Sequence, residues 1–100
     1  MSLEKANNIN IKKTYRTEKQ KKAITNRLNR IEGQIRGINQ MIKNDRYCDD
    51  ILIQISAVKK SLESLANNIL ECHLKGCVTS DLKNGNIEII DEVMNLIKKL

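Results

Sequence analysis

The sequence predicts an all-α protein that folds as one small domain and associates with further copies of itself. Its 100 residues include no Pro and only four Gly, and two Tyr are its only aromatic residues. Apolar residues recur at alternating spacings of four and three, which is the period of one helix face. Because so short a chain with so few aromatic side chains builds a thin core, oligomerisation is expected.

The first helical stretch has one apolar face and one basic face. Its apolar stripe predicts packing against another helix and consists of Ile24, Leu28, Ile31, Ile35, Ile38 and Ile42. On a helical wheel the opposite face carries Lys19, Lys22 and Arg30, together with Gly33 and Gly37. Each glycine costs a helix about 1 kcal/mol. A phosphate backbone, a neighbouring subunit or simple tolerance would each account for the pair.

A second helical stretch is predicted to run unbroken from about residue 47 to about residue 82. Asn44 and Asp45 favour the turn before it. Its apolar residues repeat the same spacing: Ile51, Ile55, Val58, Leu62, Leu65 and Ile69. Gly85 then supplies a helix C-cap, and a third helix to the end of the chain is marked by Ile87, Ile90, Met94 and Ile97.

These stretches predict a three-helix protomer in which residues 17–100 form one domain and residues 1–16 a flexible basic tail. The protomer is too small to cover both sides of the long second helix. We therefore expect two chains to form an antiparallel four-helix bundle, with dimers pairing further into a dimer of dimers. The expected assembly is a homodimer or homotetramer.

Positive charge is concentrated in the first half of the chain. The net charge is +6, but residues 1–46 carry 12 Lys/Arg against 4 Asp/Glu, whereas residues 47–100 carry 6 against 8. This asymmetry favours a polyanionic partner, nucleic acid before an acidic membrane surface, over a merely solvated charge run. The first 20 residues resemble no signal peptide, and no 18-residue apolar run is present. We expect a cytoplasmic protein without a membrane partner.

The stretch ECHLKGC, residues 71–77, holds two of the three cysteines and the only histidine. His73 and Cys77 are four residues apart and share a helix face. Cys48 lies 25 residues before His73, about 37 Å along a helix. On an ideal wheel Cys48, His73 and Cys77 fall within about 40° of one another, whereas Cys72 lies about 100° from His73.

Antiparallel packing of two copies of the second helix would complete this set of ligands. With the two-fold axis near Ser61 and Leu62, Cys48 of each chain lands beside His73 and Cys77 of the other. Two thiolates and one imidazole form a soft, three-coordinate set, which suits Cu(I) and leaves Zn(II) without its usual fourth ligand. Cys72 or a water would have to supply that position for zinc. The alternative to a metal site is that these cysteines are inert, buried side chains that serve only in packing.

Three stretches of the chain resemble the CsoR/RcnR family of bacterial metal- and thiol-sensing repressors. RLNRIEGQIRGINQMI is similar to the family's first helix, YCDDILIQISAVKKSL to the start of its second helix, and HLKGC to its ligand pair. The spacing of Cys48, His73 and Cys77 resembles the copper-sensing branch. The nickel- and cobalt-sensing branch uses further histidines, the persulfide-sensing branch lacks the histidine, and the formaldehyde-sensing branch lacks the last cysteine.

This resemblance implies a transcriptional repressor that binds operator DNA without a helix-turn-helix and releases it when Cu(I) binds, derepressing copper-resistance genes. By position it implies Tyr47 and Glu92 as residues that support the metal ligands. It also places Arg27, Arg30 and Arg36 on a DNA-binding surface. Cys72 departs from the family pattern and leaves room for further thiol chemistry.

Two other functions compete with copper sensing. One is a sensor of persulfides or electrophiles that uses Cys48 and Cys77 as a dithiol across the interface. The other is a thiol enzyme in which His73 activates Cys77. The enzyme is disfavoured because no third group orients the base and no glycine-rich oxyanion loop is present. We therefore expect a non-enzymatic protein with Cu(I) as its sensed ligand.

Overall fold

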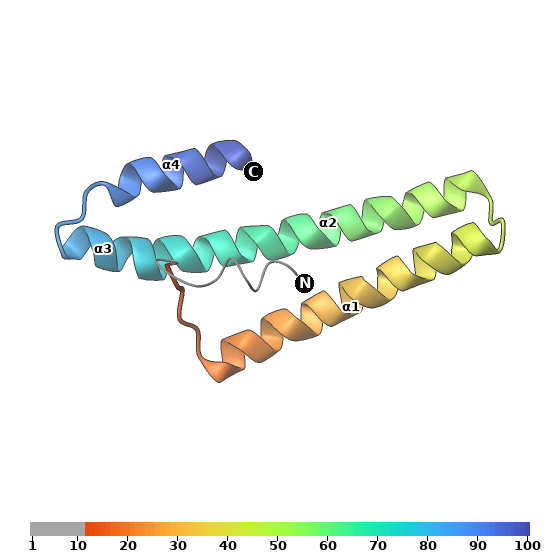
Figure 1. Cartoon of the computed structure of the whole chain (residues 1–100), viewed down its shortest axis with the longest axis horizontal. Helices are drawn as coiled ribbons and strands as arrows, with labels where there is room; N and C mark the ends of the chain where they lie inside the picture. The colour runs from red at the N-terminus through yellow and green to blue at the C-terminus, as the bar shows by residue number, and fades with distance from the viewer. Residues whose placement is uncertain (1–11) are drawn as a thin grey trace.

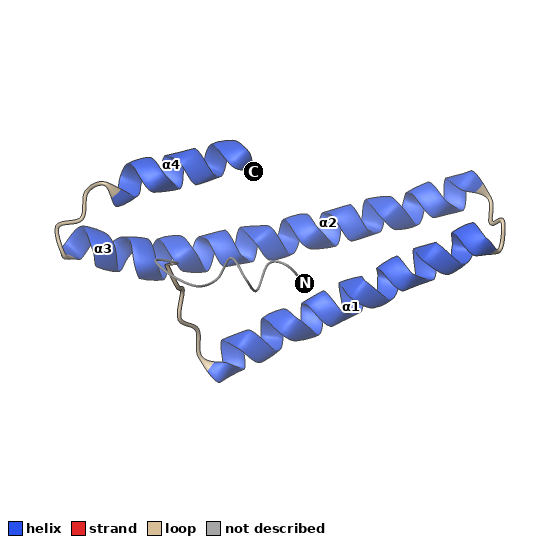
Figure 2. Ribbon diagram, in the orientation of Figure 1, coloured by secondary structure: helices blue, strands red, loops and turns tan. Residues whose placement is uncertain are grey.

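The computed structural model of the chain describes residues 12–100, which contain helices and no strand (Figures 1 and 2). This confirms the predicted all-α class. The helical elements are α1 (Glu18–Lys43), α2 (Cys48–His73), a π-helical turn (Leu74–Val78), α3 (Thr79–Lys83) and α4 (Ile89–Lys99). The tail predicted for residues 1–16 lies mostly outside the described residues.

The helices form an elongated protomer with α2 at its centre. Figure 1 shows α1 and α2 as an antiparallel hairpin, α3 continuing the line of α2, and α4 turning back along α2. The principal extents are 56 × 27 × 26 Å. The far end of α2 and the start of α1 are therefore brought to the same end of the molecule as α3 and α4.

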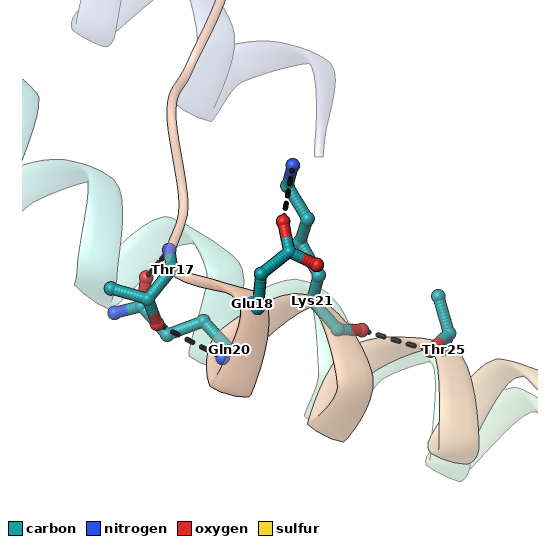
Figure 3. A network of polar contacts seen from close by, with 5 residues as sticks. All are labelled: Thr17, Glu18, Gln20, Lys21 and Thr25. Atoms are coloured by element: carbon teal, nitrogen blue, oxygen red, sulfur yellow. Dashed lines mark hydrogen bonds and ion pairs between the residues drawn. The ribbon is translucent and has the colours of Figure 1, made fainter.

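Local side-chain contacts fix the start of α1 (Figure 3). Thr17 and Gln20 form a capping box, in which the Gln20 backbone N–H donates to the Thr17 hydroxyl and the Thr17 N–H donates to the Gln20 side chain. These bonds satisfy two of the N–H groups that a helix start leaves without partners. Glu18 lies in the first turn, where a negative charge complements the helix dipole.

The two turns between the long elements form where the sequence predicts them. Asn44 ends α1, and Asp45 takes a φ of 54°, a left-handed conformation that Asp and Asn tolerate better than most residues. Gly85 follows α3 with a φ of 85°, which a glycine adopts at no steric cost. The helix breaks at residues 44–45 and 85 are confirmed.

Two small apolar clusters hold the protomer together. Ile31 of α1 packs with Val58 and Leu65 of α2, flanked by the partly buried Ile24, Ile38 and Ile69. Val78 packs with Ile89 and Val93 of α4. The second cluster attaches α4 to the helical path that follows α2.

The third helix is present, but it starts later than the four residues that predicted it indicate. The helix begins at Ile89, and Ile87 precedes it with 70% of its surface exposed. Ile90, Met94 and Ile97 also remain substantially exposed, whereas Ile89 and Val93 are buried. Apolar residues occupy more than one side of this helix, so periodicity alone does not select the side that packs within the chain.

The predicted second helical stretch is confirmed in its extent, but it is not α-helical throughout. The helical path reaches Lys83, close to the predicted end, but the α-helical pattern stops at His73 and a π-helical turn follows before α3. The Thr79 hydroxyl donates to the Leu74 carbonyl across 2.8 Å and so provides that carbonyl with a partner inside the turn. Such π turns interrupt α-helices and often occur at functional sites.

Only half of each long apolar stripe packs within the chain. On α1 and α2, the stripe residues that alternate with the buried ones remain exposed: Leu28, Ile35, Ile42, Ile55 and Leu62. A monomer gains nothing from leaving these large side chains in water. They form the surface available to the association that the sequence predicts.

Candidate metal centre and nucleic-acid interface

The candidate ligands His73 and Cys77 lie where α2 passes into the π-helical turn. Both are half-buried, and both line a cavity of about 340 Å³ between the start of α1 and the end of α2. Cys72, which is exposed, lines the same cavity. One imidazole and two thiols therefore line the cavity, and neither thiol is in a disulfide bond.

Cys48 and Tyr47 lie at the opposite end of α2. Tyr47 is the N-cap and Cys48 the first residue of this 26-residue helix, which ends at His73. At 1.5 Å per residue, Cys48 is about 37 Å along the helix from His73. Residues 12–100 of one chain accordingly contain no cluster of three His, Cys, Asp or Glu side chains that could hold a metal ion. The chain brings His73 and Cys77 together and leaves Cys48 apart.

Glu92 and His73 both line a second cavity of about 370 Å³ at α4. Its carboxylate accepts a hydrogen bond from the Lys12 ammonium at 2.8 Å. That hydrogen bond, followed by the Coulombic attraction, raises the pKa of Lys12. Glu92 thus shares a cavity with one of the ligands that the resemblance gives it to support, but its partner in this structure is Lys12, in the segment preceding α1.

One further ion pair borders the candidate ligands. The Lys75 ammonium donates to the Glu71 carboxylate at 2.6 Å, four residues apart on the helical path. This hydrogen bond lowers the pKa of Glu71 and raises that of Lys75. Both side chains are exposed, so the pair has little weight in stability.

Arg27 and Arg30 face a groove of about 460 Å³ between α1 and α2. The half-buried Arg27 donates from Nη2 to the Ser64 hydroxyl of α2 at 3.1 Å. Lys60 of α2 lines the same groove, and no acidic residue does. Three cations from two helices, with serine hydroxyls between them, make a surface suited to phosphate oxygens.

The other predicted basic residues lie apart from this groove. Arg36 forms an ion pair with Glu32 at 2.6 Å, one turn away on α1. Lys19 and Lys22 are exposed near the start of α1. An alanine Cβ placed at Gly37 would meet nothing within 4 Å, and at Gly33 only the Arg36 guanidinium at 3.8 Å. No part of the described chain therefore makes the close approach that the two glycines suggested.

Sequence analysis missed Lys60 and Ser64 as members of the basic groove. They lie in the half of the chain whose net charge is negative, and Ser64 is 37 residues from its partner Arg27. Pairing α1 with α2 in antiparallel register about the turn at residues 44–47 would have placed residues 60–64 opposite Arg27 and Arg30. The antiparallel register of the two helices could therefore have identified Lys60 and Ser64 from the sequence.

Comparisons with known proteins identify the family of the chain. The family described as metal-sensitive transcriptional repressor matches residues 20–99. The copper-sensing transcriptional repressor CsoR of Bacillus subtilis is 49% identical over 86 residues, covering 85% of each chain. The copper-sensing transcriptional repressor RicR of Mycobacterium tuberculosis is 52% identical over 66 residues, covering 66% of this chain and 69% of that one.

A solved structure agrees with these sequence relationships. The copper-sensing repressor CsoR with Cu(I) from Geobacillus thermodenitrificans superposes with a TM-score of 0.85 at 38% identity, covering 92% of this chain and 97% of that chain. The fold, the matched residues and the sequence identity agree. The chain belongs to the CsoR/RcnR family of metal-sensitive transcriptional repressors.

Proposed function

We propose that this protein is a cytoplasmic copper(I)-responsive repressor that binds operator DNA in its metal-free form and releases the DNA on binding Cu(I). It acts as a homodimer or homotetramer. His73 and Cys77 of one chain and Cys48 of its partner are the proposed ligands. The copper-sensing relatives support the choice of metal. Among residues 12–100, no helix is long and apolar enough to cross a membrane.

The observation that carries this proposal is the separation of the ligands along one continuous helical path, α2 and the π-helical turn that follows it. His73 and Cys77 share a cavity at one end of α2, and Cys48 begins the other end. Antiparallel pairing of two α2 helices would bring each Cys48 to the other chain's pair. The exposed Ile55 and Leu62 on α2 provide an apolar surface for such pairing.

The donor set fits Cu(I). Thiolates and an imidazole are soft ligands, and three of them satisfy an ion that accepts a low coordination number, whereas Zn(II) sites usually have four ligands. Bound Cu(I) would link the ends of two chains. In this chain Glu92 is close enough to share a cavity with His73 and would orient its second ring nitrogen, and Tyr47 would act beside Cys48.

DNA binding is assigned to the basic surface of α1. Arg27 and Arg30 in the groove are the principal phosphate contacts, and Lys19, Lys22 and Arg36 extend the positive surface along the helix. Electrostatic contact of these cations with phosphates is expected to dominate the affinity for DNA. Membership in a family of transcriptional repressors supports a binding role without catalysis.

Mixed oligomers test the shared metal site. Cys48→Ala chains and His73→Ala/Cys77→Ala chains each lack part of every site. In a heterodimer of the two, one of the two sites retains all three ligands. Mixing should therefore restore about one tight Cu(I) site per heterodimer, measured by competition with a Cu(I) chelator. If the mixture binds no more Cu(I) than its parents while wild type binds tightly, the intersubunit site is refuted.

A further inference from the structure

The thiol of Cys72 is the reactive group in this region that the proposed copper site does not use. Cys72 is exposed, and it lines the same 340 Å³ cavity as Cys77. Neither cysteine is in a disulfide. Two free thiols of one chain therefore border one solvent-connected space, five residues apart in the sequence.

The π-helical turn changes how two such cysteines are placed. In a regular α-helix, residues five apart differ by about 140° in direction and by about 7.5 Å along the axis. That rise alone exceeds the Cα–Cα span of about 4.4–6.8 Å that a disulfide accepts. In a π turn the backbone hydrogen bond runs from i to i+5, so residues five apart come round to the same side of the helix. Cys77 lies within the turn at Leu74–Val78 and Cys72 precedes the turn by two residues, so the wider turn forms part of the path that joins the two cysteines.

The surroundings of the turn leave room for the thiols to approach each other. A Cβ at Gly76, between them, would meet no atom within 4 Å. Tyr15, which also lines the cavity, has 84% of its surface exposed, so its ring does not seal the opening. A small solute can therefore reach Cys72 from the solvent.

We propose that Cys72 and Cys77 form a reversible intrachain disulfide when the metal-free protein meets a hydroperoxide. The Cys72 thiolate attacks a peroxide oxygen, the O–O bond breaks, and a hydroxide or alkoxide leaves and takes up a proton. The Cys77 thiolate then attacks the sulfur of the resulting sulfenic acid. The S–O bond breaks and the hydroxide released is protonated to water. The two thiols lose two electrons and the peroxide gains them.

This modification would remove a ligand from the copper site, a consequence that rests on the proposed function. Cys77 in a disulfide has no thiolate to offer, and the remaining Cys48 and His73 form an incomplete set. Oxidation of one chain would thus block Cu(I) binding at the metal site to which that chain contributes Cys77. A thiol reductant would restore it.

Peptide mapping tests the thiol pairing directly. Trypsin cleaves after lysine and arginine, and the cleavage sites around the three cysteines are Arg46, Lys59, Lys60, Lys75 and Lys83. Cleavage there places Cys48, Cys72 and Cys77 on separate peptides, 47–59, 61–75 and 76–83. Metal-free wild type is treated with hydrogen peroxide, its remaining thiols are alkylated, and it is digested without reduction. We expect peptide 61–75 joined to 76–83 in protein that migrates as a monomer on a non-reducing gel.

Either of two results would overturn the pairing. One is a covalent dimer in which 47–59 is joined to 76–83, and the other is oxidation of single cysteines without any cross-link. The Cys48→Ser variant is the matched control and should form the same intrachain link as wild type. The Cys72→Ser variant should form no disulfide within a monomer.

Copper uptake tests the consequence separately. After peroxide treatment, the Cu(I) bound per wild-type chain should fall in proportion to the cross-linked fraction and recover with dithiothreitol, whereas Cys72→Ser should keep its uptake. Equal loss in both proteins would refute the consequence for copper. If reduced wild type binds no Cu(I), the proposed function fails, and the peptide map still decides whether the disulfide forms.

Discussion

The Arg27 guanidinium on α1 donates a hydrogen bond to the Ser64 hydroxyl on α2 at 3.1 Å. This contact ties the basic surface of the first helix to the helix that carries the candidate metal ligands. A change in the position of α2 would therefore move Arg27 with it. The contact provides a physical route by which an event at the end of α2 can alter the spacing of the cations proposed to bind DNA.

Arg30 is expected to bind DNA phosphates and is not among the proposed metal ligands. Its side chain lines the groove and contacts none of the proposed ligands there. Arg30→Ala should weaken DNA binding, reduce the slope of log affinity against log salt by about 0.9 for the lost phosphate contact, and leave Cu(I) affinity unchanged. Fluorescence anisotropy over a salt series measures the slope. Unaltered DNA binding after neutralising Arg27, Arg30 and Arg36 together would place the DNA elsewhere.

We expect the second helix to contribute to DNA binding through Lys60. Because Lys60 lines the groove with Arg27 and Arg30 whereas the neighbouring Lys59 does not, the two lysines form a matched pair with equal charge. Lys60→Ala should reduce the salt slope by about 0.9, and Lys59→Ala should change it less. If both variants behave alike, net charge rather than the groove governs affinity.

Substitutions at Leu65 and Leu62 should distinguish the stability of the protomer from its association with further copies. Leu65 is buried with 4% of its surface exposed, whereas Leu62 is 45% exposed on the same helix. Leu65→Ala should lower the free energy of unfolding by about 2–5 kcal/mol through cavity formation. Leu62→Ala should mainly weaken self-association, measured by sedimentation over a range of concentrations. An unchanged association constant for Leu62→Ala would exclude this face of α2 from the dimer interface.

His73 is the ligand expected to transmit metal binding to the rest of the protein. It shares a cavity with Glu92, so we expect its second ring nitrogen to donate to that carboxylate when the metal is bound, and we expect the two thiolates to supply most of the affinity for Cu(I). His73→Ala should still bind Cu(I) but remain on DNA when loaded. Equal release of DNA by Cu(I)-saturated His73→Ala and wild type would refute this role.

The helical hairpin could be predicted because its determinants are local. The four-and-three spacing specifies α1 and α2, and Asn44, Asp45 and Gly85 specify the breaks through their own backbone preferences. The position of Cys48 at one end of α2 and of His73 and Cys77 at the other follows from helix length alone.

Three features depended on information that local patterns lack. The π turn at Leu74–Val78 is a choice between hydrogen-bond partners one residue apart, and no residue type there dictates it. Ile89 and Val93 pack in preference to Ile90 and Met94 because of where α4 meets Val78. The Lys12–Glu92 pair and the Arg27–Ser64 bond join residues 80 and 37 positions apart.

The coupling between metal and DNA is the central claim, and one titration tests it most directly. Metal-free wild type is bound to a labelled DNA fragment that it has selected from a random-sequence library, and Cu(I) is added anaerobically while anisotropy is followed. Linkage requires that metal and DNA weaken each other's binding by the same factor, and a useful switch needs about 1–3 kcal/mol of coupling. We expect the DNA to be released as the proposed sites fill. Saturation with Cu(I) while the DNA stays bound with unchanged affinity would contradict the account.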